Sequence, residues 1–506
     1  MFVRQVNQIV ENLIGVKTDG PIYWRDIKDD SRQVVPGDVF IALPSYSGKD
    51  GDYYIDQAVR QGANFIIRQS DVNYSYLKSI KIDDKEVACL NIADLKDIHG
   101  SLISHFYGLP SAQMTMIGVT GTNGKTSVVN LIAASLEGLN IKCGVIGTLG
   151  HGLSHKLLEK QNQTTPCALQ LQKILANIAK EDAQVCAMEV SSHGIDQMRV
   201  GGICFDIAIL TNISHDHLDY HGTMEAYMDC KERLFYDFNP VHIIVNLDDP
   251  LGERIFLRGG QGSNLMAYTF KAQGKRNDVA YCRVLEKSLL GQTVEVKYQG
   301  KVLQINSRLT GSYNAQNIMS AFLALCMMGY EPFKAIEALQ QVTHIPGRFE
   351  VIASEIGPTV IVDYAHTPDA LKNVLMTLQE VTSSKIWCVF GCGGDRDKEK
   401  RPKMGMIAEK YADYVVLTSD NPRSESPRQI IQDIKSQMIA NWAIHEKIDR
   451  VEAIRYAIKQ ASRNDVVLIA GKGHETIQIF ASNQVAHRDS EVARRVLDGL
   501  ILEMGY

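Results

Sequence analysis

Short, almost uninterrupted apolar runs recur along this chain, and segments with apolar residues at helical spacing lie between them. Such runs predict strands that are buried on both faces. The middle of the chain has five, at Met114–Val119, Cys143–Ile146, Val185–Val190, Ile207–Thr211 and Ile243–Asn246. Helical periods at Ser127–Leu139 and Asn314–Met328 accompany them, so we expect a mostly parallel α/β sheet.

The same alternation restarts after His344–Arg348, where Pro and Gly interrupt any regular element and predict a hinge. The later runs predict a second doubly wound domain. They are Thr359–Asp363, Ile386–Phe390, Tyr414–Leu417 and Val466–Ala470. Before the hinge, Glu286–Ser307 predicts a hairpin that turns at Gln299-Gly300.

The first block has shorter elements, with strands expected at Val39–Leu43 and Asn64–Arg68 and a helix at Tyr54–Gln61. A chain of 506 residues exceeds one ordinary core. The predicted fold class is therefore α/β in three domains, comprising residues 1–92, 93–345 and 346–506.

Composition narrows the classes of function. The chain is 45% hydrophobic and 22% charged, as in soluble globular proteins, and its net charge of −5 argues against a nucleic-acid or anionic-membrane surface. We expect no membrane span, because no run reaches about 18 apolar residues. The ten cysteines form no Cys-x-x-Cys pair, and the first seven residues lack the apolar core of a signal peptide. Both features favour the reducing cytoplasm.

A phosphate loop is the first candidate for chemistry. Thr120-Gly-Thr-Asn-Gly-Lys-Thr126 follows one predicted strand and opens the next helix. Glycines let backbone N–H groups close on phosphate oxygens, and the helix N-terminus adds partial positive charge. Lys125 can reach terminal phosphates and the Thr126 hydroxyl can bind Mg²⁺. The motif predicts ATP or GTP binding. One alternative is a plain glycine turn that only joins the strand to the helix. Another is a P-loop motor or GTPase, but the sequence shows no guanine-specificity motif.

Two further segments carry candidate ligands. Glu189 ends a predicted strand in the sheet that bears the phosphate loop, where a carboxylate is well placed for Mg²⁺. His215, His217 and His221 stand close in sequence, yet no companion cysteine or carboxylate set has familiar zinc spacing. A magnesium-linked or substrate-orienting histidine is favoured over zinc. The sequence pattern alone predicts that Lys231 is a solvent-exposed residue of a helix.

Several motifs together resemble the Mur ligases, ATP-dependent enzymes that form amide bonds in peptidoglycan synthesis, and more distantly folylpolyglutamate synthetases. The motifs are the phosphate loop, Glu189-Val-Ser-Ser-His, Asn212-Ile-Ser-His-Asp-His-Leu-Asp and Asp363-Tyr-Ala-His-Thr-Pro-Asp. Others are most similar to the branch that makes UDP-N-acetylmuramoyl-tripeptide. These are Asp30-Ser-Arg, Pro36-Gly-Asp-Val-Phe, Asp50-Gly, Gly393-Gly-Asp-Arg-Asp, Asp420-Asn-Pro-Arg and Gly471-Lys-Gly-His-Glu.

The resemblance implies a UDP-binding domain, a central ATPase domain and a Rossmann-like domain that brings an amino acid. It implies that a carboxylate of UDP-MurNAc-L-Ala-D-Glu attacks ATP and that an amine then attacks the resulting acyl phosphate. Lys231 would be carbamylated by CO₂, which turns a cation into an oxygen ligand for Mg²⁺. The implied catalytic residues are Lys125, Glu189, His217 and Lys231, and the last three would bind Mg²⁺ together with Thr126.

The resemblance also assigns substrate contacts. ATP contacts would be Gly121, Thr122, Asn123, Gly124, Lys125, Thr126, Asn314, Asn317, Arg348 and His366. Muramyl-peptide contacts would be Ser31, Thr164, Thr165, Ser191, Gln197 and Arg199. Amino-acid contacts would be Arg396, Asp420, Asn421, Pro422, Arg423, Gly471 and Glu475.

Arg423 bears on which amino acid is added. Meso-diaminopimelate carries one more carboxylate than lysine, and a guanidinium fork suits a carboxylate. We therefore expect that the enzyme adds diaminopimelate. We also expect it to be monomeric and cytoplasmic. The alternatives are a lysine-adding or folylpolyglutamate-type ligase, and a relative that keeps the fold only as an interaction protein.

Overall fold

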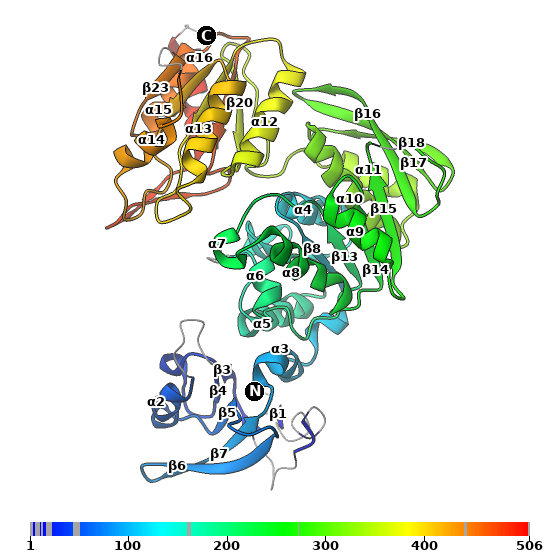
Figure 1. Ribbon diagram of the computed structural model, residues 1–506, viewed down its shortest axis with the longest axis vertical. Helices are drawn as coiled ribbons and strands as arrows, with labels where there is room; N and C mark the ends of the chain where they lie inside the picture. The colour runs from blue at the N-terminus through cyan, green and yellow to red at the C-terminus, as the bar shows by residue number, and fades with distance from the viewer. Residues whose placement is uncertain are drawn as a thin grey trace. The chain divides into compact units, whose positions relative to one another are not determined.

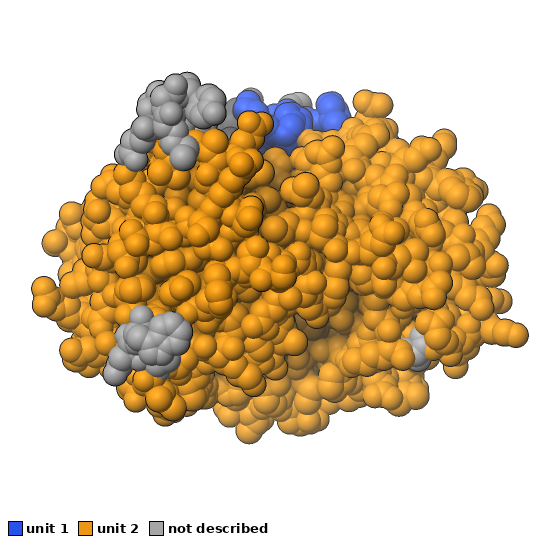
Figure 2. Space-filling view, turned by 90° about the horizontal axis from the view of Figure 1, so that it is seen from above, with its two compact units in different colours: residues 1–118, 141–208, 230–241 blue, residues 119–140, 209–229, 242–506 orange. Residues whose placement is uncertain are grey.

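A computed structural model describes residues 4–5, 11, 14–16, 23–43, 51–158, 163–271, 273–439 and 443–503. Asp50 of the first-domain motif and most of the first seven residues lie outside this part of the chain. The protein divides into two compact units, coloured in Figure 2. Unit 1 holds residues 1–118, 141–208 and 230–241, and unit 2 holds residues 119–140, 209–229 and 242–506.

Unit 1 begins with β1 (Arg4–Gln5) paired to β2 (Tyr23–Trp24), followed by a five-stranded sheet of order β3-β4-β5-β7-β6. Only β6 runs antiparallel to its neighbour. The strands are β3 (Ile27–Lys28), β4 (Val39–Ala42), β5 (Phe65–Gln69), β6 (Tyr76–Ile82) and β7 (Lys85–Ile92). Helices α2 (Ile55–Gln61) and α3 (Leu95–Phe106) accompany them. The three elements expected in this block are confirmed to within one residue at each end.

The largest sheet has eleven strands in the order β11-β10-β9-β12-β8-β13-β14-β15-β16-β17-β18. Its apolar strands match the five predicted runs, namely β8 (Thr115–Thr120), β9 (Cys143–Gly147), β12 (Val185–Glu189), β13 (Ile207–Leu210) and β14 (His242–Asn246). Short β10 (Gly150–Leu153) and β11 (Lys156–Leu158) extend one edge in antiparallel fashion. β15 (Asn264–Thr269) continues the parallel part beside β14.

The predicted hairpin is part of a larger meander. β17 (Gly291–Tyr298) and β18 (Lys301–Ser307) pair across the expected Gln299-Gly300 turn, but β16 (Val279–Ser288) adds a third antiparallel strand. The helices of this region are α4 (Lys125–Gly138), α5 (Ala168–Lys180), α6 (Ser192–Asp196), α7 (Leu218–His221), α8 (Met224–Tyr236), α9 (Pro250–Arg258), α10 (Ser312–Met327) and α11 (Pro332–Gln340).

The last part of unit 2 is a six-stranded sheet of order β19-β20-β24-β21-β22-β23, in which only β19 (Glu350–Ile352) is antiparallel. β20 (Thr359–Asp363), β21 (Ile386–Phe390), β22 (Tyr414–Leu417) and β24 (Val466–Ala470) fall on the predicted residues, and β23 (Ile444–Glu446) completes the sheet. A short hairpin of β25 (Ile477–Ile479) and β26 (Gln484–Ala486) follows.

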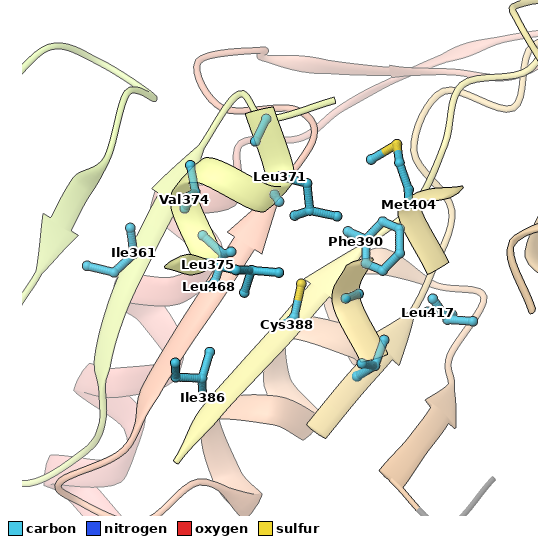
Figure 3. Packing of buried hydrophobic residues seen from close by; sticks show 14 of the residues in the cluster. Ile361, Leu371, Val374, Leu375, Ile386, Cys388, Phe390, Met404, Leu417 and Leu468 are labelled. Atoms are coloured by element: carbon cyan, nitrogen blue, oxygen red, sulfur yellow. The ribbon is translucent and has the colours of Figure 1, made fainter. Parts of the chain in front are cut away.

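Helices cover both faces of this sheet (Figure 1). Ile361, Phe390 and Leu468 pack on one face among side chains of α12 (Pro368–Val381), α13 (Lys400–Tyr411) and α14 (Pro427–Lys435) (Figure 3). Their sequence neighbours, such as Val362 and Ile469, pack on the other face with α15 (Arg450–Gln460) and α16 (Asp489–Glu503). This alternation explains why the strands are apolar throughout and confirms the doubly wound prediction.

None of the helices that the structure describes is both long and apolar enough to cross a bilayer. All ten cysteines are free thiols, and Cys143, Cys186 and Cys388 are buried, as their place in apolar runs predicted.

Candidate active site

The phosphate loop has two glycines that no other residue can replace without strain. Gly121 and Gly124 have φ values of 145° and 88°. A Cβ atom on Gly121 would lie 1.9 Å from Thr211 Oγ1, and one on Gly124 would lie 2.5 Å from Asn317 Oδ1. Both the backbone conformation and the close approach therefore require glycine.

Residues 211–214 hold this loop in place. The Asn212 carbonyl accepts from Thr122 N at 2.7 Å, and its Oδ1 accepts from Asn123 N at 3.0 Å. Thr211 Oγ1 donates to the Asn123 carbonyl at 2.6 Å, and Ser214 N donates to Thr122 Oγ1 at 2.9 Å. The segment after β13 thus fixes the backbone of the loop, a task that sequence reasoning did not assign to it.

Lys125 and Thr126 open helix α4 directly after the loop. Lys125 Nζ donates to the carbonyls of Gly121 and Thr122, both at 2.9 Å, so its ammonium lies against the loop itself. Thr126 is 4% exposed, and its Oγ1 accepts from Arg348 Nη2 at 2.9 Å. The expected hinge residue therefore reaches the first turn of α4.

Arg348 is oriented by residues that follow strand β20. Its guanidinium carbon lies 4.5 Å from the ring centre of Tyr364, a cation–π arrangement. The Tyr364 ring also contacts the rings of His366 and His474, with centroids 4.6 and 5.0 Å away. His366 Nδ1 lies 2.9 Å from the Tyr364 carbonyl oxygen. Arg348 and His366, which the resemblance assigns to ATP, share one aromatic neighbour.

Asp363 anchors the hinge from the end of β20. Its carboxylate accepts from the backbone N–H groups of Phe349 and Ala365, both at 2.7 Å. Burial raises the pKa of Asp363, while the Arg348 charge acts in the opposite direction. The residue directly after the hinge and the segment after β20 are thus tied to one buried carboxyl group.

The charged groups around the loop influence one another. Partial burial disfavours the Asp216 carboxylate, but the charges of His217, His366 and Lys125 outweigh it and lower its pKa. His217 Nε2 lies 3.5 Å from Asp216 Oδ2, and the His217 side chain is 46% exposed. His217 therefore belongs to the electrostatic surroundings of the phosphate loop.

Asn314 and Asn317 lie in the first turns of α10, which begins two residues before Asn314. Both are buried, with 1% and 4% exposure. Asn314 Nδ2 donates to the Thr310 carbonyl at 2.8 Å, and Asn317 Nδ2 donates to Asn314 Oδ1 at 3.2 Å. Because Asn317 Oδ1 packs against Gly124, the start of α10 borders the phosphate loop.

The predicted amino-acid contacts gather at the carboxyl edge of the last sheet, in the loops after β21, β22 and β24. A Cβ atom on Gly393 would lie 3.0 Å from Arg423 Nη1 and 3.7 Å from Arg396 Cγ. The Arg423 guanidinium and the aliphatic part of the Arg396 side chain therefore both lie close to Gly393. Arg423 has a left-handed φ of 50°, and its Nη1 donates to the Gly394 carbonyl at 2.8 Å. Burial and, after it, Arg396 lower the pKa of Arg423.

Acidic and amide groups lie beside this pair. A Cβ atom on Gly471 would lie 2.7 Å from Asp420 Oδ2, and the φ of Gly471 is 110°. Asn421 Nδ2 donates to Glu475 Oε2 at 2.8 Å, and Asn421 N donates to Asp420 Oδ1 at 2.6 Å. Pro422 directly precedes Arg423. This edge of the sheet thus carries cationic and anionic groups side by side, which suits a zwitterion.

In unit 1, Glu189 ends β12 as predicted and is 1% exposed. Its Oε1 accepts from Thr148 N at 2.7 Å and its Oε2 from Thr148 Oγ1 at 3.1 Å. A carboxylate oxygen pair and the Thr126 hydroxyl are donors of the type that Mg²⁺ prefers. Thr148 was missed by sequence reasoning, although it follows a strand end at the same edge.

The prediction that Lys231 is exposed to solvent is wrong, because this residue of α8 is only 1% exposed. Pattern alone failed because α8 is largely polar and tertiary packing decides which of its faces is covered. A buried ammonium carries a large desolvation cost, so this position demands chemistry that compensates the charge.

The predicted muramyl-peptide contacts in the middle of unit 1 form one network. Thr165 Oγ1 donates to the Glu189 carbonyl at 3.0 Å and accepts from Ser191 N at 2.9 Å. Arg199 Nη1 donates to the Thr165 carbonyl at 2.8 Å, and Arg199 Nε donates to Gln197 Oε1 at 2.9 Å. These residues surround the end of β12.

The other two predicted muramyl-peptide contacts are Thr164 and Ser31. Thr164 Oγ1 lies 3.4 Å from Thr148 Oγ1, in the same network. Ser31 lies in the five-stranded-sheet region, buried to 3% exposure, and its Oγ donates to Gln57 Oε1 at 2.8 Å.

Known proteins of one family are similar to this chain over most of its length. Residues 119–325 match the Mur ligase middle domain, and residues 347–473 match the family described as Mur ligase, glutamate ligase domain. A Coxiella burnetii protein named UDP-N-acetylmuramoyl-L-alanyl-D-glutamate--2,6-diaminopimelate ligase is 42% identical over 474 residues, 93% of this chain and 95% of that protein. A Neisseria meningitidis serogroup A protein of the same name is 40% identical over 92% of this chain and 93% of its own length.

A solved structure described as the same ligase covers 99% of this chain and 100% of its own, with 34% identity and a TM-score of 0.71. The chain therefore belongs to the Mur ligase family. The resemblance drawn from the motifs is confirmed, and so is the α/β class.

Proposed function

We propose that this chain is the ligase that adds meso-diaminopimelate to UDP-MurNAc-L-Ala-D-Glu, with ATP as the activator, in cytoplasmic synthesis of peptidoglycan precursors. Relatives at about 40% identity over nearly the whole chain bear that activity in their names. The observation that carries the assignment is the guanidinium fork of Arg423, which lies beside Gly393 together with the Arg396 side chain. This fork suits the extra carboxylate that distinguishes diaminopimelate from lysine.

The three domains are assigned to three tasks. Residues 1–92 would hold the UDP-sugar, residues 93–345 would hold ATP, and residues 346–506 would bring the amino acid. We propose that the protein acts as a monomer.

ATP would lie on the phosphate loop, Gly121 to Thr126, with its phosphates against the backbone N–H groups and Lys125. Asn314 and Asn317 would border the nucleotide from α10, and Arg348 and His366 would reach it from the hinge and from the segment after β20. The hydrogen bond from Arg348 to Thr126 supports the proposal that Arg348 contacts the nucleotide.

Magnesium would neutralise the charges that approach during the first step. One ion would lie at Thr126, and a second would be held by His217 and the carbamate of Lys231, with Glu189 in the magnesium shell. The hydroxyl, carboxylate and carbamate are hard oxygen ligands of the kind that suit this ion. Carbamylation joins the neutral Lys231 amine to CO₂ and releases one proton. The reaction replaces a buried cation by an anion that a nearby cation can stabilise, which the 1% exposure of Lys231 favours.

The muramyl dipeptide would be held by Ser31 and by the network around Glu189. Thr164, Thr165, Ser191, Gln197 and Arg199 offer hydroxyl, amide and guanidinium donors to its peptide and carboxylate groups. Asp420, Asn421, Pro422, Gly471 and Glu475, with the two arginines, would receive the zwitterionic end of diaminopimelate.

Two steps follow from these groups. A carboxylate oxygen of the D-glutamyl residue attacks the γ-phosphorus of ATP, which releases ADP and leaves an acyl phosphate. The amine of diaminopimelate then attacks the acyl carbon and expels phosphate, and the amine loses a proton. One oxygen of the original carboxylate must therefore end in the released phosphate.

The test uses UDP-MurNAc-L-Ala-D-Glu labelled with ¹⁸O in its terminal carboxylate. We expect phosphate release that requires both this substrate and diaminopimelate, with one label transferred to phosphate. Absence of amide product with this substrate, or turnover of a folate in its place, would overturn the assignment.

A further inference from the structure

Behind the proposed amino-acid contacts lies a lysine that the function above does not use. Lys472 is 0% exposed, the second residue of the loop after β24. Its Nζ donates to Asn421 Oδ1 at 2.9 Å and to Glu475 Oε2 at 2.6 Å. Glu475 Oε2 accepts in addition from Asn421 Nδ2 at 2.8 Å. The three side chains close a triangle of hydrogen bonds.

This triangle determines which way the Asn421 amide faces. Its Oδ1 accepts from both Lys472 Nζ and the backbone N–H of Ile479, the latter at 3.0 Å. In the reversed orientation its NH₂ group would meet those two donors and lose the Glu475 carboxylate. The Lys472 ammonium therefore holds the amide in one orientation.

The triangle also fixes the Glu475 carboxylate. The Glu475 side chain is 27% exposed, whereas Lys472 is wholly buried, so the lysine lies on the protein side of the carboxylate. One oxygen, Oε2, is turned inward to Lys472 and Asn421. Glu475 also lies within the electrostatic reach of Arg423. Both its position and the compensation of its negative charge therefore depend on the buried ammonium.

We infer that Lys472 is a positioning residue that sets selectivity for a zwitterionic amino-acid side chain. This inference rests on the proposed function. By holding Glu475 and Asn421 and balancing the Glu475 charge, Lys472 lets the site accept an ammonium group and a carboxylate together. Without it, the site would lose one positive charge beside Glu475, which shifts the charge balance towards a purely cationic side chain such as that of lysine.

The test compares Lys472→Met with the unmodified enzyme and with Lys385→Met. The control removes an ion pair with Asp413, 2.7 Å long, that lies before β21 at the opposite edge of the same sheet. We expect Lys472→Met to raise KM for diaminopimelate on the order of ten-fold or more, since a buried charged contact is lost. KM for ATP and for the UDP-dipeptide should stay within about two-fold, and the ratio of kcat/KM for diaminopimelate to that for lysine should fall.

A double-mutant cycle separates positioning from general destabilisation. In a Glu475→Gln background, Lys472→Met should have little further effect on KM for diaminopimelate, because it acts through that carboxylate. Should Lys472→Met fail to fold, Lys472→Gln takes its place in the same cycle. Equal losses for diaminopimelate and lysine, or additive effects in the cycle, would overturn the inference.

The unmodified enzyme separates this inference from the proposed function. If it uses another amino acid in place of diaminopimelate, the proposed function fails. The same variants are then measured with that amino acid, and a change in its KM against an unchanged KM for ATP still decides the role of Lys472.

Discussion

Arg348 Nη2 donates a hydrogen bond to Thr126 Oγ1 over 2.9 Å, although 222 residues separate them in the sequence. The contact joins the hinge before the last sheet to the first turn of the phosphate-loop helix. Tyr364 holds the guanidinium from its other side at 4.5 Å. A residue that carries the chain between two sheets thus touches the helix that follows the phosphate loop.

Arg348→Ala is expected to weaken ATP binding. Loss of a charge-assisted hydrogen bond costs about 1.5–3 kcal/mol, so KM for ATP should rise on the order of ten-fold or more. Arg494→Ala is the matched control, because Arg494 forms a half-exposed ion pair with Glu350 near the same hinge. Steady-state kinetics with varied ATP measure both variants. Equal KM values for the two variants would show that Arg348 has no role at the nucleotide.

Gly124→Ala is expected to abolish nucleotide binding, since its Cβ atom would meet Asn317 Oδ1 at 2.5 Å. Gly329→Ala is the control: its φ of 92° resembles the 88° of Gly124, but nothing lies within 4 Å of its added Cβ. Both should lose roughly 1–2 kcal/mol of stability from backbone strain. Titration with a fluorescent ATP analogue distinguishes them. Similar affinities in the two variants would contradict the steric argument.

Removal of CO₂ is expected to lower the activity if Lys231 works as a carbamate. Prolonged dialysis against CO₂-free buffer should reduce the rate, and bicarbonate should restore it. Lys231→Ala and Lys231→Arg should be inactive and insensitive to bicarbonate, because neither can form the anionic ligand. Full activity of Lys231→Arg, or indifference of the unmodified enzyme to CO₂, would refute the modification.

Asp26 predicts a pH-dependent contribution to stability in unit 1. Burial opposes its ionisation, but hydrogen bonds from Lys28 Nζ and Tyr107 Oη, both 2.7 Å, outweigh burial and lower its pKa to about 2. A lowered folded-state pKa stabilises the fold above the unfolded value of about 3.9, and the contribution disappears as pH falls towards 2.

Asp26→Asn tests this sign. Thermal unfolding midpoints of the two proteins should differ most at pH 7, and the difference should shrink at pH 3. A difference that is the same at both pH values would mean that packing, and not the charge, is responsible.

The apolar strands were predictable because burial on both faces removes ambiguity from their sequences. Ile386–Phe390 and Val466–Ala470 are apolar at every position and fall where the sequence placed them. β10 and β11 were not predicted, since a short glycine-containing strand such as Gly150–Leu153 has no apolar run. β16 was also missed as a strand, because half of it is polar and exposed.

Only those parts of the candidate site that lie within short sequence motifs could be predicted from the sequence. The glycines and Lys125 follow from local backbone chemistry, and Arg423 follows from the fork that a carboxylate requires. The burial of Lys231 and the triangle around Lys472 depend on packing between distant segments. Sequence spacing alone therefore could not reveal them.

The most direct measurement is phosphate release from ATP with UDP-MurNAc-L-Ala-D-Glu and either meso-diaminopimelate or L-lysine, for the unmodified enzyme and Arg423→Ala. We expect rapid release with diaminopimelate and far slower release with lysine. Arg423→Ala should lose the diaminopimelate reaction while it still binds ATP. Equal or faster turnover of lysine by the unmodified enzyme would contradict the assignment of this chain as a diaminopimelate-adding ligase.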